Sequence, residues 1–173
     1  MQIKTIVVLG SLNNAVDLSA LTDLGNSYKL TRSQGYLKLR DNITASLYKT
    51  GKVQIYGIKQ VSDIPQIWKE MAEIIKPYVD VSHIDKEPVL KFMVGVEKLP
   101  YQIDLPKICA AFPKENIEYE PEQFPGLIWK TGAGTALLFS SGSAVISGLN
   151  SEEKILACIS YLREKVEPVL FQK

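Results

Sequence analysis

The sequence has few of the residues that build metal centres and disulfide frameworks. Its 173 residues include two cysteines, Cys109 and Cys158, and one histidine, His83. Zinc and similar ions need several Cys or His ligands at close spacing, which this sequence does not offer. Both cysteines lie in apolar segments with helical periodicity, where a buried free thiol is the usual state. We therefore expect no metal, no disulfide and no cofactor.

The sequence also lacks a long apolar run and a recognisable catalytic motif. No segment approaches the roughly 20 apolar residues of a membrane span, and the N-terminus has no charged-then-apolar leader. Gly132-Ala133-Gly134 lies between two predicted strands rather than between a strand and a helix, so it is not a phosphate-binding loop. No nucleophile has a suitably spaced base. We expect a soluble intracellular protein that has no membrane association and is not an enzyme.

A strong excess of charge of either sign is absent too. With 20 Lys and Arg against 19 Asp and Glu, the net charge is +1, which by itself argues against a strong polyanion binder. The distribution is uneven, because residues 29–59 contain one acid, Asp41, and seven basic residues: Lys29, Arg32, Lys38, Arg40, Lys49, Lys52 and Lys59. The equivalent window, residues 120–150, holds Lys130 against two glutamates. One half of the protein is therefore basic and the other nearly neutral.

The chain contains an internal repeat. Residues 28–57 align without a gap on residues 119–148, so that each residue of the first copy lies 91 positions before its counterpart. A constant offset over this length indicates a duplication. Because no linker rich in Pro, Gly or Ser separates the halves, we expect one domain, residues 1–173, made of two fused repeats, 1–88 and 89–173.

Each repeat predicts a strand, a short helix, further strands and a long helix. The expected strands include residues 2–9, 36–40, 44–48, 53–56 and 90–96, and the expected short helices are residues 18–24 and 104–112. One long helix begins near Ser62-Asp63-Ile64-Pro65, and the closing helix is capped by Asn150, with Glu153 three residues on. The closing helix is expected to bury an apolar stripe: Ile155, Leu156, Ile159, Leu162 and Val166. This order predicts an α+β fold, with both long helices on one face of an antiparallel sheet of about ten strands.

The other face of the sheet, which we call the open face, is left without a helix. Side chains alternate between the faces of a strand, so packing of Val53 and Ile55 against a helix turns Gln54 and Tyr56 to the open face. The same rule places further residues of both repeats there: Thr44, Ser46, Tyr48, Thr135, Leu137, Phe139, Val145 and Ser147. An exposed apolar set of this kind indicates an interaction surface.

One strand of the first repeat poses a register problem. The gapless alignment turns Lys38 and Arg40 toward the helices, where burial of their charges is costly. A one-residue bulge reverses the faces of a strand. We therefore expect a bulge near Gly35, with Tyr36, Lys38 and Arg40 on the open face.

The second copy carries two motifs. They are YEPEQFPGLI, residues 119–128, and LLFSSG, residues 137–142, and the copy closes at Ser147-Gly148. These motifs resemble the C-terminal repeat of the TATA-box-binding protein family, and the repeat order and length extend the resemblance over nearly the whole chain. The resemblance implies a saddle in which two pseudo-symmetric repeats form one curved antiparallel sheet, with the helices on its convex face.

In that family the concave face lies in the DNA minor groove, and pairs of phenylalanines wedge between base steps and kink the duplex. The resemblance assigns wedge positions to Phe124 and Phe139, whose first-copy counterparts are Ser33 and Tyr48. The family's two base-contacting asparagines correspond to Thr5 and Phe92, which cannot make an amide contact. The predicted DNA-binding residues are Phe124, Phe139, Val94, Leu137, Val145, Ser147, Lys130, Tyr48, Tyr56, Lys38, Arg40 and Thr5.

The resemblance also implies a protein partner. The loop with Glu120, Glu122 and Gln123 corresponds to the place where the family engages transcription factor B.

The sequence leaves three functions open. The chain is a TATA-binding-protein paralogue that binds and bends double-stranded DNA with relaxed sequence preference, a regulatory module whose open face binds a protein, or an accessory module that binds RNA–DNA hybrids. We expect a monomer or weak dimer, nucleoid-associated in the cytoplasm of a prokaryote or nuclear in a eukaryote.

Overall fold

The computed structural model describes residues 1–172 and divides into two compact units. The N-terminal unit comprises Thr5–Lys91, and the C-terminal unit comprises Met1–Lys4 together with Phe92–Lys173. The two boundaries fall inside the first strand of each repeat, so the units follow the duplication only approximately.

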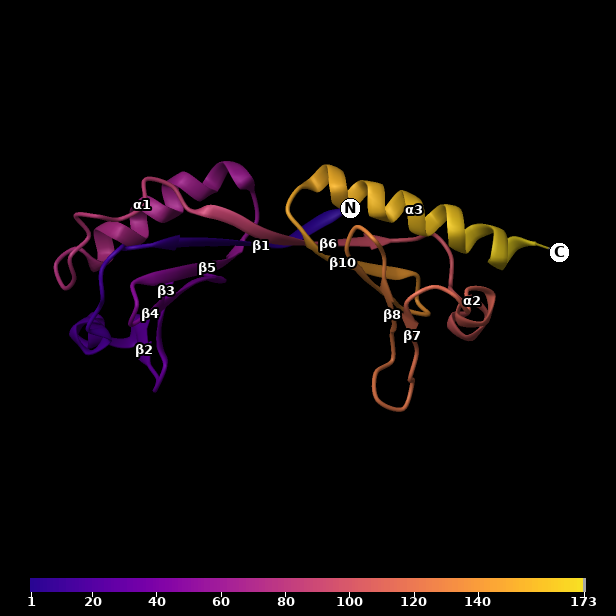
Figure 1. Cartoon of the computed structure of the whole chain (residues 1–173), viewed down its shortest axis with the longest axis horizontal. Coiled ribbons are helices and arrows are strands. Elements are labelled where there is room, and N and C mark those ends of the chain that lie inside the picture. The colour runs from indigo at the N-terminus through magenta and orange to yellow at the C-terminus, as the bar shows by residue number, and fades with distance from the viewer. Residues whose placement is uncertain (173) are drawn as a thin grey trace. The chain divides into compact units, whose positions relative to one another are not determined.

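The N-terminal unit contains the first repeat (Figure 1). Its strands are β1 (Gln2–Ser11, which begins in the other unit), β2 (Tyr28–Leu30), β3 (Gln34–Arg40), β4 (Ile43–Tyr48) and β5 (Lys52–Ile58). Its helices are the 3-10 helices η1 (Leu18–Ser27) and η2 (Val61–Asp63) and the α-helix α1 (Ile64–Ile75).

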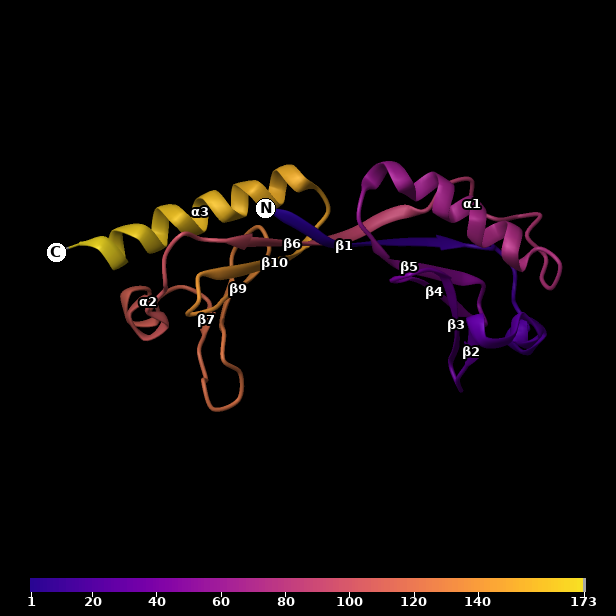
Figure 2. The same ribbon diagram turned by 180° about the vertical axis from the view of Figure 1, so that it is seen from behind.

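The C-terminal unit repeats this order (Figure 2). Its strands are β6 (Val89–Lys98), β7 (Ile117–Glu118), β8 (Leu127–Lys130), β9 (Thr135–Leu138) and β10 (Ser143–Leu149). Its helices are α2 (Leu105–Ala111) and α3 (Glu152–Phe171).

The ten strands belong to one antiparallel sheet in the order β2-β3-β4-β5-β1-β6-β10-β9-β8-β7. Within the N-terminal unit α1 runs along one face of the strands, and within the C-terminal unit α3 does so (Figure 1). The α+β prediction of about ten antiparallel strands with the long helices on one face is confirmed.

Glycines allow both long helices to pack close to the sheet. A Cβ on Gly10 of β1 would lie 2.4 Å from the ring of Trp68, and a Cβ on Gly95 of β6 would lie 2.8 Å from Ile155. Trp68 is 3% exposed, and Ile155 is fully buried. Each helix therefore places a large side chain where the first strand of its repeat has none.

The α3 helix differs from its prediction in two ways. Ser151, not Asn150, caps it, because the Ser151 hydroxyl accepts the backbone N–H of Lys154 at 3.2 Å. Leu156 is 49% exposed, whereas Cys158 is buried. The buried stripe thus lies over Cys158 and Ile159 in the first turns, and the predicted burial of Leu156 is wrong.

The connector after α1 is tied to the end of β1. The Asp85 carboxylate accepts the backbone N–H of Ser11 at 2.8 Å and the side-chain amide of Asn13 at 2.8 Å. The indole N–H of Trp68 donates to the Asp85 carbonyl at 2.8 Å. These bonds fix the connector against both β1 and α1.

The two repeats differ in the link before β3 and β8 and in the register of these strands. Leu47 of β4 pairs with Gly35, whereas its counterpart Leu138 pairs with Leu127, so β3 is displaced by one residue from the gapless alignment. The link between the paired strands β2 and β3 is also shorter than the link between β7 and β8. The first repeat therefore has no equivalent of the long loop over residues 119–126.

Candidate nucleic-acid interface

The open face of the C-terminal unit is apolar. Val145 lies opposite Leu137 on one side and Val96 on the other, and Leu137 in turn lies opposite Ile128. All four side chains are half-buried, while the alternate residues of these strands are buried beneath α3. Val94 belongs to the same face of β6 as Val96. A row of apolar side chains therefore crosses the strands of this unit on the face opposite α3.

Two aromatic rings stand beside this row. Phe124 and Phe139 meet edge to face, with ring centroids 5.8 Å apart and an interplanar angle of 69°. Gly126 lies beneath both, because a Cβ there would be 2.7 Å from the Phe124 ring and 3.0 Å from the Phe139 ring. The absence of a side chain at Gly126 thus lets the two rings pack against each other at the edge of the open face.

Polar side chains lie next to the apolar row on the same face of the sheet. Lys130 lies opposite Thr135, and Thr135 opposite Ser147, so all three share the open face. The Lys130 ammonium donates to the Glu118 carboxylate at 2.6 Å. Both partners are about half exposed, and an exposed pair of this kind contributes little to stability. Lys130 is therefore available to exchange Glu118 for a phosphate.

The open face of the N-terminal unit has a different chemistry. Tyr36 lies opposite Ser46, and Ser46 opposite Gln54; along the next row Lys38 lies opposite Thr44, and Thr44 opposite Tyr56. Tyr48 lies opposite Gln34. The strand pairing therefore places three tyrosines among hydroxyl, amide and ammonium groups, where the C-terminal unit presents aliphatic side chains.

The bulge in β3 occurs between Lys38 and Arg40 rather than near Gly35. Tyr36 and Lys38 accordingly lie on the open face as predicted. The prediction for Arg40 is wrong: its guanidinium pairs with the carboxylate of Glu70 on α1, with an Nε to Oε2 distance of 2.9 Å. The hydrogen bond from Arg40 lowers the pKa of Glu70. The bulge turns Arg40 to the helix side, so it leaves the candidate interface.

The remaining candidate residues, Thr5 and Phe92, lie on the first strand of each repeat. The Thr5 hydroxyl accepts the backbone N–H of Gly57 at 2.8 Å, and Gly57 has a φ of 93° in the irregular part of β5. The oxygen of Thr5 is therefore engaged within the protein. Phe92, on the face of Val94, is half-buried.

Several open-face residues escaped the sequence prediction. In the N-terminal unit Lys29 lies opposite Tyr36 and Gln34 opposite Tyr48. In the C-terminal unit Val96 lies opposite Val145, Ile128 opposite Leu137, and Glu118 opposite Ile128. Alternation along β8, where Leu127 and Trp129 are buried, would have predicted Ile128. To predict the position of Lys29, one would need the register of the three-residue strand β2, which the sequence pattern does not specify.

The loop with the candidate partner residues is compact. The backbone N–H groups of Gln123 and Phe124 both donate to the Glu120 carbonyl at 2.9 Å. Glu120, Pro121, Glu122 and Gln123 line a shallow hollow of about 280 Å³, and all four residues are exposed. The loop therefore presents two carboxylates around a depression.

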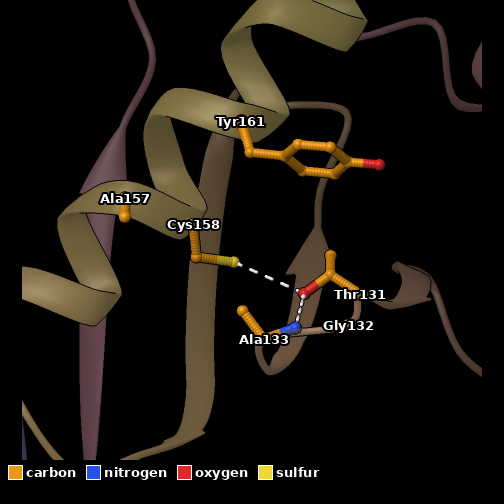
Figure 3. Close-up of a pocket in the computed structure, with 6 residues that line it drawn as sticks. All are labelled: Thr131, Gly132, Ala133, Ala157, Cys158 and Tyr161. Atoms are coloured by element: carbon orange, nitrogen blue, oxygen red, sulfur yellow. Dashed lines mark hydrogen bonds between the residues drawn. The ribbon is translucent and has the colours of Figure 1, made fainter.

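A separate pocket of about 310 Å³ lies between α3 and the β8–β9 turn (Figure 3). The Thr131 hydroxyl is occupied by the turn, since it donates to the Gly134 carbonyl at 2.8 Å and accepts the Gly134 N–H at 3.0 Å. Burial raises the pKa of the neighbouring Cys158 thiol. The pocket lies on the helix side, so it does not belong to the open face.

Residues 1–172 contain no helix that could span a membrane and no cluster of three or more His, Cys, Asp or Glu placed to hold a metal ion. Both cysteines are free thiols.

Comparison with known proteins identifies the family of this two-repeat chain. The family model for "Transcription factor TFIID (or TATA-binding protein, TBP)" matches residues 1–78 and 88–169. The chain belongs to this family, which is one of transcription factors and not of enzymes.

Individual proteins are similar over almost the full chain. The TATA-box-binding protein of Thermoplasma volcanium is 31% identical over 173 residues, covering 96% of this chain and 94% of the relative. TATA-box-binding protein 3 of Methanosarcina acetivorans is 30% identical, covering 95% and 94%. In structure, the TBP of Methanococcus jannaschii matches with a TM-score of 0.79 and 24% identity over 97% of this chain and 98% of that one.

Proposed function

We propose that this chain is a DNA-binding transcription initiation factor that binds double-stranded DNA through its open face and bends it, with relaxed sequence preference. The observation that carries the proposal is the Phe124–Phe139 pair over Gly126, beside an uncovered apolar row. An apolar side chain that inserts between two base pairs costs a few kcal/mol of unstacking, which the added contact with bent DNA offsets. The row with Leu137 and Val145 supplies that contact.

The two units make different contacts with DNA in this proposal. Phe124 and Phe139 form a wedge in the C-terminal unit only, because the first repeat has a short turn with Ser33 and a tyrosine, Tyr48, in place of the second ring. The N-terminal unit contributes Lys38 and Tyr56, which suit phosphate contacts and hydrogen bonds to the groove. We expect the kink on the C-terminal side to be the larger.

Relaxed sequence preference follows from the first strands. Amide side chains read bases by paired hydrogen bonds, and neither Thr5 nor Phe92 has an amide. The Thr5 oxygen also accepts the Gly57 N–H. Specificity then rests on the ease with which a sequence is kinked, which favours flexible AT-rich steps by a modest margin.

Electrostatic contacts are tested by two neighbouring cations on β3. Lys38→Ala should flatten the plot of log affinity against log salt by about one unit, because one phosphate contact contributes roughly 0.9 to that slope. Arg40→Ala is the matched control: Arg40 pairs with Glu70 on the helix side, so the slope should not change. Fluorescence anisotropy at several salt concentrations measures both. Equal slopes for Lys38→Ala and the native protein would remove the N-terminal unit from the site.

We further propose that the loop with Glu120, Glu122 and Gln123 binds transcription factor B. Replacing both glutamates by alanine should weaken recruitment of archaeal transcription factor B to the preformed DNA complex by about tenfold, through loss of two charge-assisted contacts. DNA binding itself should persist. Alanines at Glu152 and Glu153, the paired acids of the first turn of α3, are the control. Recruitment that is equally weak in both double variants would contradict the assignment.

The alternative is a regulatory module whose open face binds a protein, with Phe124 and Phe139 as anchors in a partner's pocket. The half-buried apolar row favours this reading more than a basic groove would. Binding of native protein to an AT-rich and a GC-rich duplex at low salt decides between the two functions, since a protein-binding module should ignore both. Because its relatives are archaeal, we place the protein at the nucleoid.

A further inference from the structure

Three tyrosines distinguish the open face of the N-terminal unit. Tyr36 lies on β3, Tyr48 on β4 and Tyr56 on β5, and all three are half-buried. Their immediate cross-strand neighbours are smaller or more flexible polar residues: Ser46, Gln34 and Thr44. The three rings therefore have polar side chains as their cross-strand neighbours. Among the described residues, no ring contact joins them.

The strand register makes two of these tyrosines neighbours on adjacent strands. Tyr36 lies opposite Ser46, and Tyr48 is two residues further along β4, so Tyr36 and Tyr48 are diagonal neighbours. Diagonal neighbours in an antiparallel pair are about 7–8 Å apart. Successive bases in a strand stack about 3.4 Å apart, so a base held between two rings needs roughly twice that spacing. The backbone spacing of this diagonal pair is therefore close to the spacing that one stacked base needs.

Cations surround the tyrosines on the same face. Lys29 lies opposite Tyr36 and makes no ion pair with any residue in 1–172, and Lys38 shares its row with Tyr56. The partner of Lys38 is Asp41 at 3.2 Å, and both side chains are mostly exposed. An exposed pair exchanges readily for a phosphate. None of the residues that strand pairing puts on this face is acidic.

Gln34 holds one of the rings in place. Its side-chain amide donates to the Tyr36 hydroxyl, and its amide oxygen is buried with no hydrogen-bond partner among the described residues. An oriented ring loses less conformational entropy when a base stacks on it.

We propose that the open face of the N-terminal unit binds single-stranded DNA, with bases stacked on Tyr36, Tyr48 and Tyr56 and phosphates beside Lys29 and Lys38. Flat rings and cations on one sheet face are the combination that holds single strands without strict sequence preference. A duplex cannot use the rings in this way because its base faces are covered. The inference rests on the proposed function in taking DNA as the polymer, but it assigns unpaired DNA to a different unit from the wedge.

The test is fluorescence anisotropy with a labelled oligothymidine of about 15 nucleotides, a length suited to such faces. Tyr48→Ala should weaken binding about tenfold, in line with the loss of one stacked base. Tyr48→Phe keeps the ring and should bind within about twofold of the native protein. Circular dichroism and thermal unfolding check that both variants fold.

Phe139→Ala is the control in the C-terminal unit. It should leave oligothymidine affinity unchanged while it reduces duplex bending measured on the same protein. Failure of the native protein to bind oligothymidine at low salt, or equal affinity of Tyr48→Ala and native protein, would overturn the inference. So would a loss of oligothymidine affinity in Phe139→Ala as large as in Tyr48→Ala. Duplex bending by the native protein tests the proposed function separately from each of these results.

Discussion

Replacing Phe139 with alanine is expected to remove most of the bend from bound duplex DNA. Phe139 and Phe124 support each other edge to face over Gly126, so loss of one ring leaves the other without its partner. The kink depends on insertion between base pairs. Affinity should fall about tenfold, because the unbent duplex contacts less of the apolar row. Energy transfer between dyes at the two ends of the duplex measures the bend.

The fold should survive this change. An edge-to-face aromatic pair contributes about 0.5–1.5 kcal/mol beyond the burial of its rings, and Phe139 is only half-buried. Phe171→Ala is the matched control, since Phe171 is 61% exposed on α3 and also meets one aromatic ring, that of Tyr101. It should leave the bend intact. If Phe139→Ala instead unfolds the protein, Phe139 belongs to the core and the open face is wrongly assigned.

Replacing Trp68 with alanine is expected to cost about 3–5 kcal/mol of unfolding free energy, the usual range for a large aromatic side chain removed from a core. The ring is 3% exposed and packs over Gly10. Its indole N–H also donates to the Asp85 carbonyl, so the variant releases the connector from α1. Since domains are typically stable by only 5–15 kcal/mol, calorimetry should show a large drop in melting temperature.

A second substitution tests the cause of that loss. Gly10→Ala should destabilise the native protein, because the new Cβ would lie 2.4 Å from the Trp68 ring. In the Trp68→Ala background the same change should cost little or add stability, as the space is then empty. Two contacting residues are expected to couple in this way. Additive effects of Gly10→Ala and Trp68→Ala would show that the ring does not depend on the glycine.

Strand alternation was enough to predict much of the candidate site. The position of Leu137, Val145, Thr44 and Tyr56 on the open face follows from period two once one buried face is assigned. The wedge position of Phe124 came instead from a motif, because nothing in the alternation of a loop residue predicts that it meets Phe139.

Other features depended on contacts that a sequence pattern does not encode. A bulge placed at Leu39 instead of near Gly35 leaves Lys38 on the open face but sends Arg40 to Glu70. Asn150 and Ser151 are both good caps, and only the geometry of the first turn selects Ser151. Leu156 fits the helical stripe by spacing, yet α3 presents Cys158 to the sheet instead.

The proposed function depends above all on bending of duplex DNA by the open face. A duplex with an AT-rich centre and a dye at each end, titrated with native protein at two salt concentrations beside a GC-rich control, tests it most directly. We predict a rise in energy transfer on binding, weaker binding at the higher salt, and only a modest preference for the AT-rich duplex. Binding without any change in energy transfer, or no binding to either duplex at low salt, would contradict the account and favour a protein as the partner of the open face.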